Sequence, residues 1–191
     1  MTIESRAGAR ARRDIIDAAL SAFAQDGFSA TSVQHIADAA DTSKSGVLYH
    51  FDSKERMLDA AITPALDALE TILNGLPPRL TSAALEDVIV AFVDFLLAHR
   101  REAAIVLIQG RSLASVPVMS RANQLVADLA EAIEAAAPNP SVKLRVGVGL
   151  AGTAYVLATG DAYAPDLTPQ PDDEVRATLI GVLSDLFARE T

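Results

Sequence analysis

The sequence lacks cysteine and tryptophan entirely, and only 5% of its 191 residues are aromatic. The absence of cysteine excludes disulfides and thiolate chemistry and is typical of proteins from a reducing compartment. No uncharged apolar run reaches the length of about eighteen residues that a membrane span needs. The N-terminal stretch "MTIESRAGARARRD" is polar and basic without an apolar core, so it does not resemble a signal peptide. We therefore expect a soluble, cytoplasmic protein.

Signals for β-structure are missing as well. Half of the residues are hydrophobic, but alanine and leucine outnumber valine, isoleucine and threonine, a bias that favours helices. No segment alternates apolar and polar residues convincingly as a strand does, and no internal repeat is present. The predicted fold class is all-α, either as one large domain or as a small domain and a larger one.

Basic residues are in deficit, with sixteen Lys and Arg against twenty-five Asp and Glu, for a net charge of −9. The deficit is uneven, because residues 1–60 hold seven basic and nine acidic side chains (−2) and residues 61–191 hold nine and sixteen (−7). Four arginines, at positions 6, 10, 12 and 13, lie together near the start. Local presentation near phosphates decides DNA binding, so the overall acidity does not exclude it.

The first part of the chain contains several helical patterns separated by turn signals. The first runs from Arg10 to Gln25 and stops before Gly27. The second lies within "TSVQHIADAA", where Thr31 and Gln34 have the spacing of a capping box. Asp41 follows it and tolerates the left-handed conformation of a tight turn. Short helices joined by such a turn predict a helix-turn-helix.

A third pattern covers about 44–51 and begins after a cap at Thr42 or Ser43. Its expected buried residues are Val47, Leu48 and Phe51. Asp52 or Ser53 caps a fourth pattern, which Pro64 interrupts. This proline marks either a hinge between domains or the first turn of a new helix capped by Thr63. Loops are predicted at 74–80 and 163–174, and further helices at 81–99, 101–112, 116–136, 141–160 and 175–189.

The donor-rich stretch at 43–54 has the composition of a DNA-reading surface. The second helix of a helix-turn-helix lies in the major groove with its N-terminal residues against base edges. At that end Lys44 and Ser45 are hydrogen-bond donors, and Gly46 lets the helix backbone come close to the DNA. Three side chains further on are placed to hold phosphates, namely Tyr49, His50 and Lys54. The N-terminus of the fourth helix would add its dipole.

The stretch "IADAADTSKSGVLYHFDSKERML" resembles the DNA-binding signature of the tetracycline-repressor (TetR) family of bacterial transcriptional regulators. The resemblance covers about residues 10–60 without a gap, and the rest of the chain agrees only in length and in being helical. Asp41 stands where the family usually has glycine. Ser45 stands where glycine is common, which would alter the bases that are read.

The resemblance implies a three-helix DNA-binding domain at 1–53 and an effector-binding and dimerisation domain at 54–191. It implies a homodimeric repressor that a small effector releases from a palindromic operator. The candidate DNA contacts are Thr31, Ser32, Gln34, Ser43, Lys44, Ser45, Gly46, Tyr49, His50 and Lys54. Each has a plainer alternative as a solvated or structural side chain, and the N-terminal arginines can equally be a solvated arm.

The expected effector is a mainly apolar small molecule with one or two polar groups, held between facing helices. Four candidates share one helix face between 92 and 99, and Arg111 or Arg121 would pair with the ligand if it is anionic. The full candidate set is Phe92, Phe95, Leu96, His99, Ile108, Gln109, Met119, Asn123 and Tyr155. Each of these can equally be an ordinary core residue. No cofactor is expected, and no compact cluster of metal-binding side chains is present in the sequence.

The two C-terminal helices are expected to form the dimer, with the alternative that they complete the core of a single protomer. The predicted interface residues are Gly149, Gly152, Ala158, Val175, Leu179, Val182, Leu183 and Leu186. Two other functions compete with a regulator. "GVGLAG" at 147–152 satisfies the spacing of a dinucleotide-binding enzyme but lacks the strands that such a site needs. An architectural DNA-binding protein without an effector would leave the long helical remainder unexplained.

Overall fold

The computed structural model describes residues 6–79, 81–137, 139–163 and 172–187, and these residues form nine helices and no strand. The first helices are α1 (Arg6–Gln25), α2 (Val33–Ala39) and α3 (Lys44–His50). The others are α4 (Lys54–Asn74), α5 (Ser82–Ala98), α6 (Arg100–Gln109), α7 (Pro117–Ala136), α8 (Pro140–Tyr163) and α9 (Asp172–Phe187). The all-α prediction is confirmed. Within the described ranges, no helix has the length and apolar character needed to cross a membrane.

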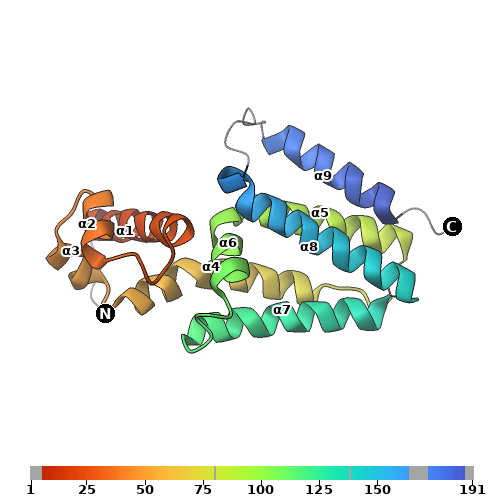
Figure 1. Ribbon diagram of the computed structural model, residues 1–191, viewed down its shortest axis with the longest axis horizontal. Coiled ribbons are helices and arrows are strands. Elements are labelled where there is room, and N and C mark those ends of the chain that lie inside the picture. The colour runs from red at the N-terminus through yellow and green to blue at the C-terminus, as the bar shows by residue number, and fades with distance from the viewer. Residues whose placement is uncertain (1–5, 80, 138, 164–171, 188–191) are drawn as a thin grey trace.

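The molecule has two helical bundles joined by one long helix. Figure 1 shows α1, α2 and α3 gathered at one end, while α5, α7, α8 and α9 lie together at the other. Helix α4 runs from the small bundle into the large one and packs on both α1 and α7. Helix α6 stands at the junction, where it packs on α1 on one side and on α8 on the other.

The small bundle, which we call the head, closes over a fully buried apolar core. Helix α1 contributes Phe23, α2 contributes Ile36, α3 contributes Val47, and α4 contributes Met57 and Leu58, all with no exposed surface. The same cluster continues along α4 to residues of α6 and α7. A second cluster joins α5, α8 and α9 and completes the large bundle. The head is therefore not an isolated unit, because its core runs into the junction.

Serine hydroxyls begin the three helices that shape the reading surface. Ser32, Ser43 and Ser53 cap α2, α3 and α4, each by accepting a hydrogen bond from a backbone amide three residues on. The predicted capping box at Thr31 is therefore wrong, since Ser32 is the cap and the Gln34 amide binds Asp38 instead. Serine fits because its short side chain reaches these amides without straining the turn.

Two turns adopt left-handed backbone, as the sequence predicts. Gly27 ends the turn after α1 with φ 88°, and Asp41 turns the chain between α2 and α3 with φ 49°. Asp is one of the few residues with a side chain that enter this region readily. The departure from glycine at Asp41 therefore leaves the turn intact.

Pro64 lies inside a continuous α4, so both interpretations of it, as a hinge and as the start of a new helix, are wrong. The proline ring is exposed, and its neighbours Ala65 and Leu66 are buried against other helices. Tertiary packing on both sides of the proline therefore outweighs the one backbone hydrogen bond that it removes. The other predicted helices are found within a few residues of their expected bounds. Of the predicted loop at 163–174, residues 164–171 lie outside the described residues.

Candidate DNA-binding surface and ligand cavity

The turn between α2 and α3 is built around Ser43 and Gly46. The Ser43 hydroxyl accepts a hydrogen bond from the Gly46 amide at 3.0 Å and contacts the Ser45 hydroxyl at 2.9 Å. A Cβ atom on Gly46 would lie 2.7 Å from the Thr42 hydroxyl oxygen, so the Thr42 side chain would have to move to admit a larger residue. Gly46 thus fits the close approach of Thr42 in this turn.

Helix α3 presents one face to solvent and one to the core. Lys44, Ser45, Leu48 and Tyr49 are exposed, and Tyr49 retains 85% of its surface. Val47 anchors the helix from behind with no exposed surface. Leu48 was predicted to be buried, and this is wrong, because it is 41% exposed on the reading face. The i, i+4 spacing from Lys44 could have indicated this position, since such residues share a helix side.

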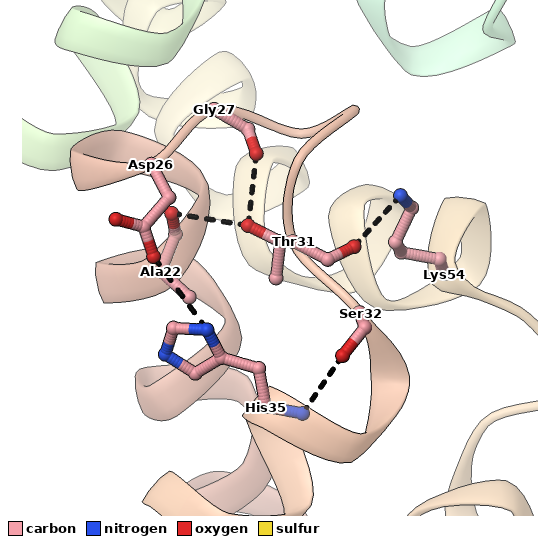
Figure 2. Close-up of polar contacts among 7 residues, drawn as sticks. All are labelled: Ala22, Asp26, Gly27, Thr31, Ser32, His35 and Lys54. Atoms are coloured by element: carbon pink, nitrogen blue, oxygen red, sulfur yellow. Dashed lines mark hydrogen bonds and ion pairs between the residues drawn. The ribbon is translucent and has the colours of Figure 1, made fainter.

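Thr31 and Lys54 both make hydrogen bonds within the head, as Figure 2 shows. Thr31 is 2% exposed, and its hydroxyl lies 2.8 Å from the Gly27 carbonyl and 3.2 Å from that of Ala22. The Lys54 ammonium donates to the carbonyls of Phe28 at 2.6 Å and Thr31 at 2.9 Å and lies 4.3 Å from the centre of the Phe28 ring. Both side chains hold the loop between α1 and α2 to the start of α4. The prediction that they contact DNA does not fit these positions.

The remaining predicted contacts lie at or near the surface of the head. Ser32 and Gln34 are exposed at the start of α2, where the neighbouring His35 pairs with Asp26 at 3.6 Å (Figure 2). His50 is half-buried and its ring meets that of Tyr49 edge-on, with centroids 5.2 Å apart. These positions leave the predicted DNA contacts of Ser32, Gln34 and Tyr49 sterically open.

The N-terminus of α4 is occupied by a carboxylate. Hydrogen bonds from its own backbone amide and from Ser53 hold the pKa of Glu55 below its ordinary value. A phosphate at this helix end would have to approach that negative charge. Glu55 takes the position at the start of α4 that the helix dipole favours for an anion.

The N-terminal arginines extend α1 instead of forming an arm in the described residues, since α1 begins at Arg6. The Arg12 guanidinium lies 4.8 Å from the centre of the Phe51 ring at the end of α3. Arg10 pairs with Asp14 at 3.8 Å, and both side chains are well exposed. Arg12 thus brings a positive charge to the edge of the reading face.

The large bundle contains a cavity of about 370 Å³ between α4, α5, α6, α7 and α8. Three predicted effector residues, Phe92, Phe95 and Leu96, line it. The sequence did not indicate the wall residues from the other helices, which include Leu66, Leu69, Val126, Leu129, Gly147 and Ala151. Small side chains on α7 and α8 leave the space open, and a Cβ atom on Gly147 would meet nothing within 4 Å.

The other predicted effector residues lie elsewhere. Ile108 and Tyr155 are more than half exposed. Met119 is fully buried in the core cluster that runs from the head along α4 to α7. Asn123 donates to the carbonyl of Gly110 at 2.9 Å. His99 does not line the cavity, but its ring lies 3.5 Å from Glu102, which does. Helical spacing alone could not separate the cavity wall from these positions.

Gln109 serves as a bridge between α6 and the head. Its amide nitrogen donates to the carbonyl of Phe23 at 2.8 Å, and its amide oxygen accepts from the backbone of Phe28 at 2.7 Å. At the other end of α6, Arg101 binds Asp17 and Ser21 of α1, both at 2.7 Å. The helix that supplies part of the cavity wall is thereby fastened to α1 at both ends.

The predicted dimer residues divide into an inner and an outer set. Leu183 is 1% exposed, and a Cβ atom on Gly149 would lie 2.8 Å from it, so these two residues close the contact between α8 and α9 within one protomer. Leu186 also faces Gly149. Val182 is 58% exposed, and Gly152 has open space around it. Ala158, Val175 and Leu179 are half-buried.

An exposed apolar surface does exist on these helices. Its large members on α8 and α9 are Leu144, Val148, Tyr155, Val156 and Val182, each exposed by more than half. The residues on α8 recur at helical spacing and share one side of the helix. We call this set the α8–α9 face. The prediction named Gly149, Gly152 and Ala158 on α8 instead, and of these Gly149 faces Leu183 within the protomer.

The glycine motif at 147–152 lies inside α8 and is helical throughout. A dinucleotide site needs these glycines in the turn between a strand and a helix. The enzyme alternative is therefore contradicted by the fold of this segment. Among the described residues, no group of three or more side chains is arranged to hold a metal ion.

The short α2, the tight turn and the exposed α3 define a helix-turn-helix protein with a second helical bundle. The pattern of the bacterial regulatory proteins of the tetR family matches residues 15–61. This match covers the head and the start of α4. Over residues 15–61 the chain is therefore similar to the DNA-binding domain of the TetR family.

Two curated relatives agree with this assignment. The repressor KstR2 of Rhodococcus jostii is 40% identical over 79 residues, which is 39% of each chain. The regulator RutR of Escherichia coli is 41% identical over 63 residues, or 33% of this chain and 30% of its own. The chain thus matches well under half the length of these relatives, and each of them is named as a regulator.

Solved structures extend the likeness to the whole fold. The ketosteroid regulator KstR2 of Mycobacterium tuberculosis superposes with a TM-score of 0.68 over 96% of this chain and 95% of its own, at 20% identity. A tetR-family protein from Rhodococcus RHA1 superposes with a TM-score of 0.62 over 93% of this chain and 97% of its own, at 19% identity. The arrangement of both bundles is therefore the one seen in these solved structures.

Proposed function

We propose that the protein is a ligand-responsive transcription regulator that binds operator DNA through α3 and represses by occupying the operator. The observation that carries this is the exposed row of Lys44, Ser45, Leu48 and Tyr49 on a helix that Val47 anchors from behind. Lysine and serine donate to base edges, and an apolar side chain such as Leu48 can contact a thymine methyl group. The family match over residues 15–61 supports the same conclusion.

The DNA contact is tested by removing single donors from the reading face. Lys44→Ala should weaken operator binding by about 1–3 kcal/mol and relax specificity at one base pair, whereas Tyr49→Phe should weaken all sequences about equally. Arg79→Ala is the matched control, because this exposed arginine follows α4 in the large bundle. Fluorescence anisotropy at several salt concentrations measures both affinity and salt slope. Equal losses for Lys44→Ala and Arg79→Ala would contradict reading by α3.

The regulator is proposed to act as a two-fold dimer through the α8–α9 face. Large apolar side chains that are exposed on two helices packed against each other indicate an interaction surface. Two copies of α8 and α9 would form an intermolecular four-helix bundle. The two heads would then read two halves of a palindromic operator.

Paired charge insertions test the dimer. Val148→Glu on the α8–α9 face should give a monomer in sedimentation velocity at micromolar concentration. Ile108→Glu is the control, because both side chains are 59% exposed but Ile108 lies on α6. Leu183→Glu is unsuitable, since its site is inside the protomer. A monomeric wild-type protein, or identical behaviour of the two variants, would overturn the proposed interface.

The cavity is proposed to hold the effector. Its volume falls within the range of small-molecule sites, and its wall is mainly apolar. A ligand that contacts Ala103, Val106 and Leu107 would press on the side of α6 whose ends are fastened to α1. If it binds better to a position of α6 that tilts the head, it shifts the protein away from DNA. An architectural DNA-binding protein would have no use for this connection.

Ligand control is tested by closing the cavity from its open side. Gly147→Trp should fill the space, since a side chain there meets no neighbour in the wild type. The variant should retain operator binding and lose the thermal stabilisation that any cavity ligand gives to wild type. Compounds from a thermal-shift screen would provide the ligands. A hit that stabilises Gly147→Trp as much as wild type would place its site outside the cavity.

A further inference from the structure

The cavity wall carries three charged side chains among its described residues, and their charges do not cancel. Glu102 comes from α6, Glu134 from α7 and Lys143 from α8, for a sum of one negative charge. The other wall residues are apolar or glycine. Which polar group of a ligand can bind here therefore depends on which of these three side chains already have hydrogen-bond or ion-pair partners within the protein.

Lys143 and Glu134 are engaged with each other. The Lys143 ammonium donates to the Glu134 carboxylate across the space between α7 and α8. This hydrogen bond, followed by the charge of Lys143, lowers the pKa of Glu134. Both side chains are exposed at the rim, at 41% and 67%. The one basic group among the described wall residues is thus already neutralised.

Glu102 differs because its side chain is only 15% exposed and borders the apolar interior. Its described polar partner is the His99 ring, 3.5 Å from one carboxylate oxygen. The two arginines beside it in sequence turn elsewhere, Arg100 to Asp172 and Arg101 to α1. A carboxylate accepts several hydrogen bonds, and one long contact leaves most of that capacity unused. Its place in the first turn of α6 favours a negative charge there.

Among the wall residues that the structure describes, an anionic ligand finds no free basic partner. Arg111 and Arg121, the arginines that the sequence indicated for such a ligand, do not line the cavity. Arg121 is bound to Asp67 and Glu70, at 2.8 and 2.6 Å. An anion would have to displace Glu134 from Lys143 and would still face the negative charge of Glu102.

We propose that the cavity selects amphipathic organic cations, with the apolar body between α4, α5 and α7 and a protonated amine bound to Glu102. The inference rests on the proposed function, in which this cavity holds the effector. An ammonium group would supply the hydrogen bonds that Glu102 lacks and would neutralise the excess charge of the wall. Glu102 would be the specificity-determining residue, because it separates amines from alcohols and acids of the same shape.

A matched series of probes tests the selectivity. Decylamine, decanol and decanoate share one alkyl chain and differ in charge, and isothermal titration calorimetry on the full chain measures each below its aggregation concentration. Decylamine should bind at least about tenfold more tightly than the other two. Glu102→Gln should remove that advantage and leave decanol unchanged. Glu131→Gln, at an exposed position of α7 outside the wall, should have no effect.

The outcomes separate this inference from the proposed function. If decanol or decanoate binds as tightly as decylamine, or if Glu102→Gln leaves decylamine binding intact, selection of cations is wrong. In that case, loss of all probe binding in Gly147→Trp would still support a ligand cavity. If Gly147→Trp binds every probe as the wild type does, the cavity is not the binding site and the effector proposal fails with it. The absence of decylamine binding to wild type overturns the inference directly.

Discussion

The head and the large bundle use their side chains in opposite ways. In the head, short helices pack around a buried apolar core. Polar side chains such as Thr31 and Lys54 form hydrogen bonds that hold the loop between α1 and α2 in place. In the large bundle, longer helices surround an open space that small residues such as Gly147 and Ala151 leave unfilled. A reading surface needs one fixed shape, while a ligand site needs room, and the two packings differ accordingly.

The largest loss of stability is expected from removing a large buried side chain from the core of the head. Phe23→Ala should lower the free energy of unfolding by about 3–5 kcal/mol, because the ring is fully buried against Phe28 with centroids 5.1 Å apart. Phe95→Ala, on the cavity wall, should lower it by much less, since that ring is partly exposed to existing space. Urea unfolding measures both. Equal losses would mean that the bundles are packed alike.

The two lysines of the head should give opposite results. Lys54→Met should lower the free energy of unfolding by about 2–3 kcal/mol, because it leaves the carbonyls of Phe28 and Thr31 without their charged donor. Lys44→Met, at an exposed site on α3, should leave stability unchanged and weaken DNA binding. Urea unfolding and anisotropy together distinguish them. A stable Lys54→Met protein with a reduced salt slope for DNA would restore the phosphate role.

The Gln109 hydrogen bonds between α6 and the head should contribute less to the free energy of unfolding than the packing of the head core. Gln109→Leu should lower the free energy of unfolding by about 1–2 kcal/mol, because the Phe28 amide and the Phe23 carbonyl lose their partner. Gln124→Leu is the control, at an exposed site on α7. The bridge variant should also bind decylamine normally while its operator affinity responds less to it. An undiminished response would show that α6 acts on the head through other contacts.

The smallest effect is expected where α9 meets α5 through surface charges. Hydrogen bonding to Arg176, with its charge, holds the pKa of Asp94 below its ordinary value. A lowered carboxyl pKa adds stability above the unfolded value, and this is lost as pH falls through the folded one. Asp94→Asn should therefore be slightly less stable at pH 7 and equal to wild type well below about pH 4. Thermal unfolding across pH checks this, and a difference that grows in acid would refute it.

The head could be predicted largely from sequence because its determinants are local. Asp41 and Gly27 mark turns, and serines precede each short helix, so the element order follows from neighbours in the chain. The predictions that do not fit the structure are those in which contacts between distant segments determine where a side chain lies. Thr31 and Lys54 look like surface donors until the loop between α1 and α2 folds back onto α4.

The cavity was only partly predictable for the same physical reason. Spacing within α5 indicated Phe92, Phe95 and Leu96 together, but five helices supply the wall. Which side of α6 faces inward is fixed by Gln109 and Arg101 binding the head, contacts about eighty residues apart in sequence. A helix pattern shows which residues share a face and leaves open which neighbour that face meets.

The claim that α3 reads DNA from a two-fold dimer is tested most directly by selecting sequences from a random duplex library with the full chain. The expected result is enrichment of an inverted repeat, whose half-sites are centred one helical turn (about 34–36 Å) or a multiple of it apart. Lys44→Ala should enrich the same repeat with one position relaxed in each half. Failure to enrich any sequence, or enrichment of a single site without symmetry, would contradict it.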